Sequence, residues 1–238
     1  MIDSNQDGTA DAGGAGFASK LVLDGSGDIK AEMVTTDSQT VIGDYDLVPI
    51  LESFIKEHPD FSYRGARATL AVTGHEGVFG YRCNTSYVTE FGNDFYEQEC
   101  ANAKKIVQAL RDKGYTIACY SYNNEDYRSF SAQQIKEDIQ KWQSQTVPVV
   151  GDVDVIIFAR TTDIDDYSGA KFKVLRDAGF GIMVNSGTSP YAEVNPDFVR
   201  QTRLMVTGNA MGWFSNRFSG YFDCNLVLDS SRGNIPNG

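Results

Sequence analysis

Histidine is scarce in this sequence, and its cysteines are widely spaced. There are two histidines in 238 residues, and the four cysteines form no CxxC pair. Zinc ribbons and thioredoxin-like redox sites both need short Cys/His spacings, so these two classes are excluded. The cysteines are interpreted as small buried hydrophobic residues. A disulfide between Cys83 and Cys100 in an exported protein is the alternative.

Long apolar runs and clusters of basic residues are also missing. No stretch of 18 apolar residues occurs, so no membrane span is predicted. The net charge is −11, and no group of Lys and Arg stands out. Because phosphate backbones repel such a surface, nucleic acid is not an expected partner. No GxGxxG or P-loop pattern follows any predicted strand, which leaves nucleotide binding without support.

What is present is an alternation of strands and amphipathic helices. A β-hairpin is predicted over 21–34, where polar and apolar residues alternate around GSGD. Strands are then predicted at 66–74, 115–122, 152–159 and 180–187, and helices at 44–58, 93–114, 131–145, 167–179 and 195–204. The strands are apolar on both faces, which is typical of a parallel α/β protein, either a barrel or a doubly wound sheet.

In such folds the functional site lies in the loops that follow the strands. The loops that follow strands here are 75–82, 120–128, 159–168 and 185–191. At these loops the sequence resembles the polysaccharide deacetylases, the NodB-homology fold of carbohydrate esterase family four. The resemblance is carried by HPDFSYRGARATLAVTGHEGVFGYR (58–82), KGYTIACYSY, DVDVIIF and GFGIMVNSGTSPY. It implies a distorted, incomplete (β/α) barrel with the hairpin at its N-terminus.

The resemblance also implies a metal site that this sequence does not keep. In that family one Asp and two His hold a divalent ion, and a second Asp activates its bound water. Tyr120 and Asn124 stand at the two histidine positions, and Ser4 stands at the metal-ligating Asp position when Asp3 is aligned with the catalytic base. Phenol and amide oxygens are weak ligands for zinc compared with imidazole. We therefore expect no zinc and a catalytically degenerate fold.

The first residues, DSNQDGTAD (3–11), have the alternating oxygen pattern of a calcium-binding loop. The predicted ligands are Asp3, Asn5, Asp7, Thr9 and Asp11, with Gly8 allowing the turn. The loop lacks the Glu of an EF-hand, so an empty acidic turn remains the alternative. We divide the chain into an Asp-rich segment, residues 1–16, and one deacetylase-like domain, residues 17–238.

Carbohydrate binding or a structural role at the cell surface is the predicted function. Side chains proposed to line the cleft, in addition to Tyr120, are Tyr81, Tyr122, Tyr127, Asp163, Asp165, Asp166 and Tyr191. One alternative is an active carbohydrate hydrolase in which the three aspartates hold a non-standard metal or act as acid and base. A second is a protein-interaction module using the aromatic tail, although core packing is the preferred interpretation of that tail. An exported protein is expected, with no signal peptide in this sequence.

Overall fold

The computed structural model describes residues 17–228. Its first strands form a small antiparallel sheet of β1 (Ala18–Leu23), β2 (Ile29–Val34) and β3 (Thr40–Gly43). The carboxylate of Asp24 holds the β1–β2 turn by accepting the backbone N–H groups of Ser26 and Asp28, at 2.8 and 3.0 Å. Gly27 supplies the positive φ of 83° that the turn needs. The hairpin predicted over 21–34 is therefore confirmed.

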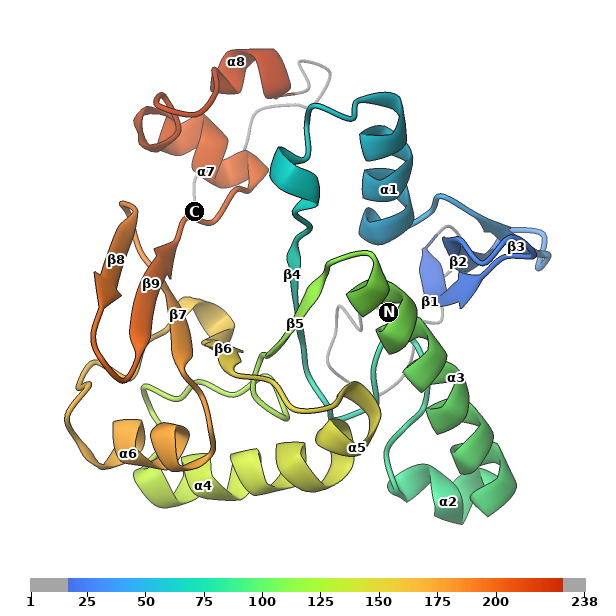
Figure 1. Ribbon diagram of the computed structural model, residues 1–238, viewed down its shortest axis with the longest axis horizontal. Coiled ribbons are helices and arrows are strands. Elements are labelled where there is room, and N and C mark those ends of the chain that lie inside the picture. The colour runs from blue at the N-terminus through green and yellow to red at the C-terminus, as the bar shows by residue number, and fades with distance from the viewer. Residues whose placement is uncertain (1–16, 229–238) are drawn as a thin grey trace.

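A larger, mostly parallel sheet forms the centre of the molecule (Figure 1). Its strand order is β4-β5-β6-β7-β9-β8, and only β8 runs antiparallel. The strands are β4 (Thr69–Val72), β5 (Thr116–Cys119), β6 (Val155–Ile157), β7 (Ile182–Ser186), β8 (Tyr191–Val194) and β9 (Val199–Arg203). The α/β class is confirmed. The pairings within residues 17–228 describe an open sheet, and closure into an incomplete barrel stays a prediction.

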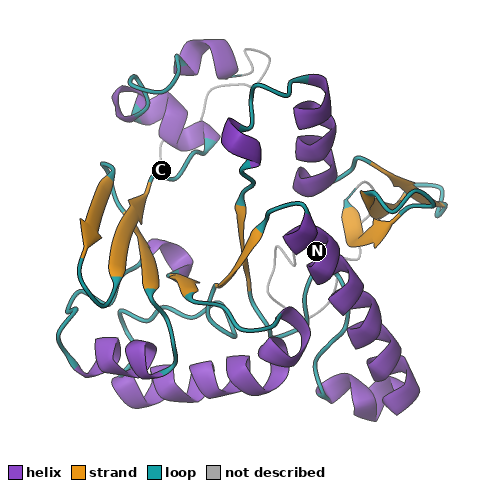
Figure 2. Cartoon of the chain, viewed as in Figure 1, coloured by secondary structure: helices purple, strands orange, loops and turns teal. Residues whose placement is uncertain are grey.

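Helices cover the sheet and connect its parallel strands (Figure 2). They are α1 (Leu47–Glu57), α2 (Ser86–Phe91), α3 (Asn93–Asp112), α4 (Ala132–Lys141), α5 (Val147–Val150), α6 (Ala170–Asp177), α7 (Gly208–Trp213) and α8 (Cys224–Val227). α4 begins at a capping box in which Ser131 and Gln134 satisfy each other's backbone N–H groups. α3 packs against β1, β2 and β5, and α4 packs against α6. None of the described helices is long and apolar enough to span a membrane.

The helix predicted over 195–204 is wrong. Asn195 and Pro196 do not begin a helix but form a turn, closed by the Asn195 N–H on the Phe198 carbonyl at 2.9 Å. The following residues form β9, which pairs with β7 in parallel and with β8 in antiparallel. Two neighbouring strands satisfy its backbone groups, and this long-range pairing outweighs the local helix-start signal.

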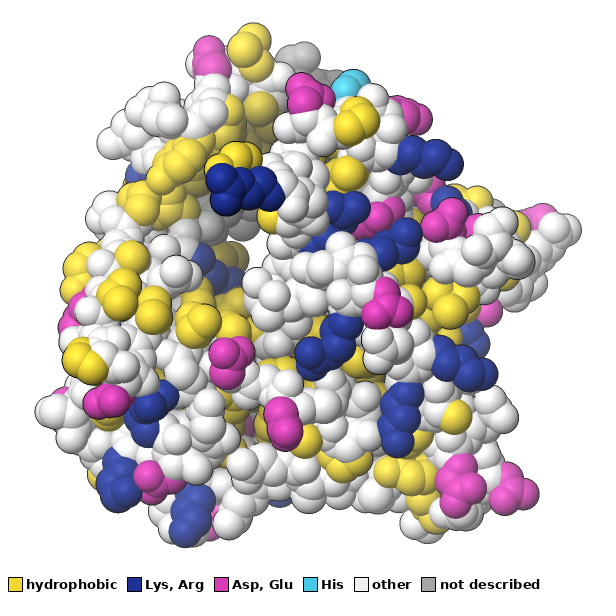
Figure 3. Space-filling view, viewed as in Figure 1, with side chains coloured by type: hydrophobic (Ala, Val, Ile, Leu, Met, Phe, Trp, Pro, Cys, Tyr) yellow, Lys and Arg dark blue, Asp and Glu magenta, His cyan; other side chains and the backbone are white. Residues whose placement is uncertain are grey.

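The core lies between the parallel sheet and its helices. Trp142, Ile135, Ile156, Leu175 and Met183 are at most 1% exposed. The C-terminal aromatic tail, predicted to be core, is divided. Phe218 is buried, but Trp213, Phe214 and Tyr221 are 38 to 65% exposed. Apolar side chains gather over this C-terminal part in the space-filling view, which also shows a hollow between β9 and β4 (Figure 3).

Candidate binding site

Three loops that follow parallel strands meet at one edge of the sheet. The segments after β4, β5 and β6 lie together because these strands are parallel neighbours. The Gly74 N–H donates to the Tyr122 carbonyl at 3.0 Å, and the Arg160 Nε donates to the Asn124 carbonyl at 2.8 Å. Loops 75–82, 120–128 and 159–168, which the sequence predicts to follow strands, therefore share one rim of the sheet.

A cavity of about 810 Å³ opens at this edge. Tyr81 and Tyr120, which the sequence placed in a cleft, both line it, together with Asn124. β4 and the loop after it form much of its wall. Its polar and charged lining comprises Lys20, Asp46, Thr69, Thr73, His75, Glu76, Arg82, Asn123, Glu125 and Arg160, together with Tyr120 and Asn124. Positive and negative side chains are both present, so the cavity suits a neutral ligand rich in hydrogen-bonding groups.

The backbone around the cavity is held in costly conformations. Phe79, Ser121, Asn124, Arg160 and Thr161 are not glycine, yet their φ values lie between 53 and 60°. Left-handed backbone costs an L-residue about 1 to 2 kcal/mol, because Cβ approaches the next carbonyl oxygen. Such strain concentrates at functional sites, where the surrounding structure maintains it. Its clustering on the three loops singles out this edge of the sheet.

A network of charged groups occupies the loop after β4. Glu76 Oε1 lies 3.2 Å from His75 Nδ1, and Glu76 Oε2 accepts from Arg82 at 2.7 Å and from the hydroxyl of Tyr87. Burial and the Glu76 carboxylate raise the pKa of Tyr87 to about 12. The His75 side chain is 53% exposed. The network therefore presents an imidazole, oriented by a carboxylate, to the cavity.

Tyr120 contacts a cation on β9, a strand that is not a neighbour of β5 in the sheet. The Arg203 guanidinium donates to the Tyr120 hydroxyl at 3.3 Å and lies 5.6 Å from its ring centre. It also donates to the Phe158 carbonyl at 3.2 Å. A fixed positive charge thus lies against the position where the resemblance calls for a metal-binding histidine. Like charges repel strongly in a partly buried site, so the residues present do not fit a divalent metal at Tyr120.

A buried carboxylate supports the loop that carries Tyr120. Asp138 of α4 accepts the Tyr122 N–H at 2.7 Å and the Tyr127 hydroxyl at 2.6 Å. Burial raises its pKa above the usual value, and these hydrogen bonds only partly offset that effect. Tyr122 and Tyr127 are 7 and 1% exposed. The two rings belong to the support beneath the loop and are not among the residues that line the cavity, so their contact with a ligand stays a prediction.

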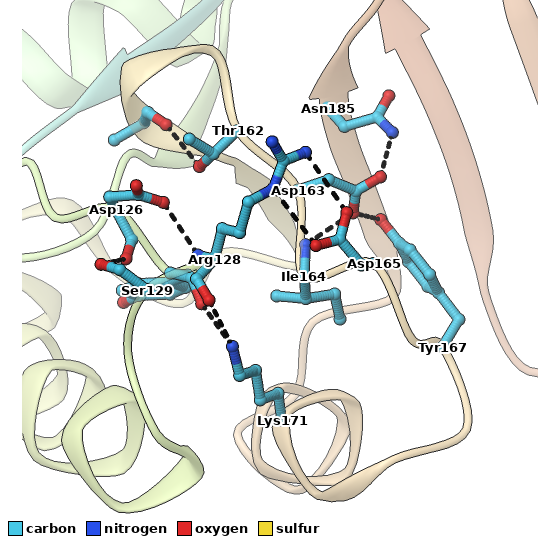
Figure 4. Close-up of polar contacts among 12 residues, drawn as sticks. Asp126, Arg128, Ser129, Thr162, Asp163, Ile164, Asp165, Tyr167, Lys171 and Asn185 are labelled. Atoms are coloured by element: carbon cyan, nitrogen blue, oxygen red, sulfur yellow. Dashed lines mark hydrogen bonds and ion pairs between the residues drawn. The ribbon is translucent and has the colours of Figure 1, made fainter.

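Asp163, Asp165 and Asp166 serve three separate structural purposes. Figure 4 shows the surroundings of Asp163 and Asp165. Asp163 is buried and accepts from Tyr167 at 2.8 Å, Arg200 at 2.8 Å and Asn185. Burial raises its pKa, but the hydrogen bonds and the Arg200 charge outweigh this, so the net pKa is lowered.

Asp165 and Asp166 point to other partners. Asp165 pairs with Arg128 at 3.2 Å, and Asp166 accepts the Ser168 N–H at 2.8 Å at the start of α6. Within residues 17–228, no three His, Cys, Asp or Glu side chains lie close enough to share a metal ion. The three carboxylates thus have separate structural partners, and their use as a metal or acid/base site stays a prediction.

The other predicted site residues lie elsewhere. Tyr191 on β8 is 51% exposed and lies 5.9 Å from the Arg200 guanidinium, away from the cavity lining. Tyr81 lines the cavity but is only 6% exposed, with its hydroxyl on the Leu21 carbonyl at 2.8 Å. Ser4 and the predicted calcium ligands Asp3, Asn5, Asp7, Thr9 and Asp11 fall outside the described residues.

Sequence reasoning missed His75, Glu76 and Arg203 as partners at this site. His75 and Glu76 were visible inside the Gly-rich GHEG segment, directly after a predicted strand. Arg203 had no such signal, because it was assigned to a helix, and it approaches Tyr120 only through the pairing of β9 in the sheet.

Comparison with known proteins gives structural matches alone. No protein-family model and no curated protein matches the sequence. The structure is similar to the Streptococcus pyogenes deacetylase PplD in complex with acetate, with a TM-score of 0.38 and 13% identity over 63% of this chain. It is also similar to a candidate polysaccharide deacetylase from Mycobacterium smegmatis, with a TM-score of 0.36 and 10% identity over 60% of this chain. The matched regions span 57 and 60% of those two proteins.

Proposed function

We propose that this protein binds carbohydrate in the cavity beside Tyr120 and does not carry out metal-assisted deacetylation. The observation that carries the proposal is the set of hydrogen-bonding groups converging there from three loops, His75 and Glu76, Asn123 to Glu125, and Arg160. Sugars present hydroxyl groups to amides and carboxylates and C–H faces to aromatic rings. A concave site with a few fixed polar groups is the usual form of a small-molecule site.

The second half of the proposal follows from the chemistry of Tyr120 and its neighbour. Metal-assisted deacetylation needs a Lewis acid and an activated water at the same place. Arg203 supplies a positive charge beside Tyr120, and Asn124 is a neutral amide with a left-handed backbone. These groups suit recognition of a polar ligand better than coordination of a cation.

Calorimetric titration with N-acetylated and deacetylated chitooligosaccharides and with xylo-oligosaccharides tests the binding. We expect at least one series to bind. Asn123→Ala should weaken that binding about tenfold, since one lost hydrogen bond in a ligand site is worth about 1.4 kcal/mol. Asn102→Ala on α3, outside the cavity lining, is the matched control and should bind like the parent. Titrations without heat in all series, or equal affinities for the Asn123 variant and the parent, would refute the proposal.

A metal-independent hydrolase is the second candidate, and one observation favours it. His75 is held by Glu76, which is itself fixed by Arg82 and Tyr87, as expected for an oriented proton-transfer group. The test is acetate release from O-acetylated oligosaccharides in the presence of EDTA. His75→Gln should abolish the release, and His58→Gln, at an exposed histidine whose ring lies 4.4 Å from that of Phe54, should not. Release unaffected by His75→Gln would exclude this candidate.

We further infer that the chain acts outside the cytoplasm, where polysaccharides are exposed. The expected calcium loop over Asp3 to Asp11 belongs to the same inference, since loops of this composition are frequent in extracellular proteins. Fractionation of the native host with an antibody against the chain would test it. Recovery of the protein in the cytosolic fraction alone would contradict the inference.

A further inference from the structure

Two cysteines that the proposed binding site does not use lie next to each other. Cys83 directly follows the residues of the β4–α2 loop that line the cavity, and Cys100 lies in the middle of α3. The residues just before them are joined directly, since the Arg82 N–H donates to the Glu99 carboxylate at 2.9 Å. Cys83 belongs to the buried core, and Cys100 packs against that core. Burial and the neighbouring Cys100 side chain raise the pKa of the Cys83 thiol. This places two reduced cysteines side by side across an otherwise non-covalent junction.

We propose that Cys83 and Cys100 form a disulfide when the protein meets a small-molecule disulfide such as oxidised glutathione. The cross-link would fasten the wall of the cavity to α3 and close a loop that contains α2. The remaining cysteines do not compete for the oxidant, because both are buried, Cys119 in β5 and Cys224 in α8.

The order of the reaction follows from exposure. Cys100 is half-buried, whereas Cys83 is 2% exposed and burial raises the pKa of its thiol. The Cys100 thiolate therefore attacks one sulfur of the oxidant first and expels one thiolate. Cys83 loses its proton, attacks the Cys100 sulfur of the mixed disulfide and expels the second. Two protein thiols are oxidised, the oxidant is reduced to two thiols, and both protons go to the departing groups.

The expected consequence is a more stable protein with a fixed cavity wall. A disulfide lowers the conformational entropy of the unfolded chain and thereby stabilises the folded state. The loop that it would close, residues 83–100, is of a length for which this stabilisation is several-fold larger than thermal energy. For a chain of this length the melting temperature should rise by roughly 5 to 10 °C on oxidation. The stabilisation does not depend on the proposed function. A difference in saccharide affinity between the reduced and the oxidised protein, by contrast, is expected only if the proposed function holds.

The test uses the whole chain, reduced and then equilibrated with oxidised glutathione under native conditions. Remaining thiols are alkylated, and the digest is examined by mass spectrometry. We expect one cross-linked peptide joining Cys83 and Cys100, two hydrogen atoms lighter than its reduced parts, and the rise in melting temperature. Cys100→Ala should lose both, and Cys224→Ser should keep both.

Alkylation of both thiols after oxidation, or a cross-link through Cys119 or Cys224, would overturn the proposal. This readout needs only the parent protein, so it holds even if Cys83→Ser does not fold. A failure of the cross-link leaves saccharide binding by the reduced protein measurable, so the two proposals can fail separately.

Discussion

The guanidinium of Arg203 donates a hydrogen bond to the hydroxyl of Tyr120 across 83 residues of sequence. Arg203 is the last residue of β9, and Tyr120 directly follows β5. The contact places a fixed cation beside the phenol of Tyr120, the residue at which the resemblance implies a metal-binding histidine. The positive charge of Arg203 therefore contributes to the electrostatic potential at the cavity edge beside residues 120–124.

The Arg203–Tyr120 contact predicts that zinc would bind at positions 120 and 124 only if the positive charge of Arg203 were also removed. A double change, Tyr120→His with Asn124→His, should bind zinc poorly while Arg203 remains, because unit charges about 4 Å apart interact by about 4 kcal/mol near a protein surface. Adding Arg203→Gln should tighten zinc binding at least tenfold. Competition with a chromogenic chelator measures both affinities. Equal zinc affinities for the double and triple variants would show that Arg203 does not control the site.

The parent protein should not release acetate from N-acetylated chitooligosaccharides, even with excess zinc or cobalt. The physical reason is that neither Tyr120 nor Asn124 offers an imidazole to hold the Lewis acid. An enzymatic acetate assay, with an active deacetylase as positive control, measures this. The prediction fails if acetate appears in a metal-dependent way and Asp165→Asn abolishes its release.

Asp163 should be a stabilising group that responds to acid. Its pKa is lowered in the folded protein, so its contribution is present above the unfolded value near 3.8 and is lost as pH falls through the folded value. Asp163→Asn should cost about 3 kcal/mol at pH 7, because it leaves the Arg200 charge partly buried and unpaired. Urea unfolding at a series of pH values measures this.

The matched control for Asp163 is Asp165→Asn, two residues further on. Its ion pair with Arg128 is exposed, so the change should cost less than about 1 kcal/mol. Equal costs for the two variants would mean that burial of Asp163 does not determine its contribution.

Asp138 should show the opposite dependence on pH. Its pKa is raised in the folded protein, so its ionisation costs folding free energy, and stability is lost as pH rises from 3.8 through the folded value. Relative to Asp138→Asn, the parent should therefore become less stable between acidic and neutral pH. Asp138→Ala should cost about 2 kcal/mol at acidic pH, since the Tyr122 N–H and the Tyr127 hydroxyl lose their acceptor, and less at neutral pH, where ionisation of Asp138 destabilises the parent. Thermal unfolding of the three proteins at pH 3 to 8 is the measurement, and parallel curves for parent and Asn variant would contradict it.

Local patterns in the sequence determined the β1–β2 hairpin, the amphipathic helix α3, the α/β class and the loops that meet at one edge. These features depend on residues close in sequence, such as the turn at 24–28 and the apolar face of α3, so periodicity and turn chemistry were enough. The prediction that Tyr120 and Asn124 stand at metal-binding positions likewise came from the sequence, because a short motif is compared residue by residue.

Tertiary structure alone decided that 199–203 is a strand, that Tyr127 and Asp163 are buried, and that Arg203 reaches Tyr120. Asn195 and Pro196 carry the local signal for a helix start, but β7 and β8 offer β9 hydrogen bonds on both sides. A tyrosine or an aspartate in a polar loop gives no sign of its burial. The partner that satisfies it comes from another element, as Asp138 does for Tyr127 and Arg200 does for Asp163. Pairings between distant segments are set by packing of the whole chain, which no local window of sequence contains.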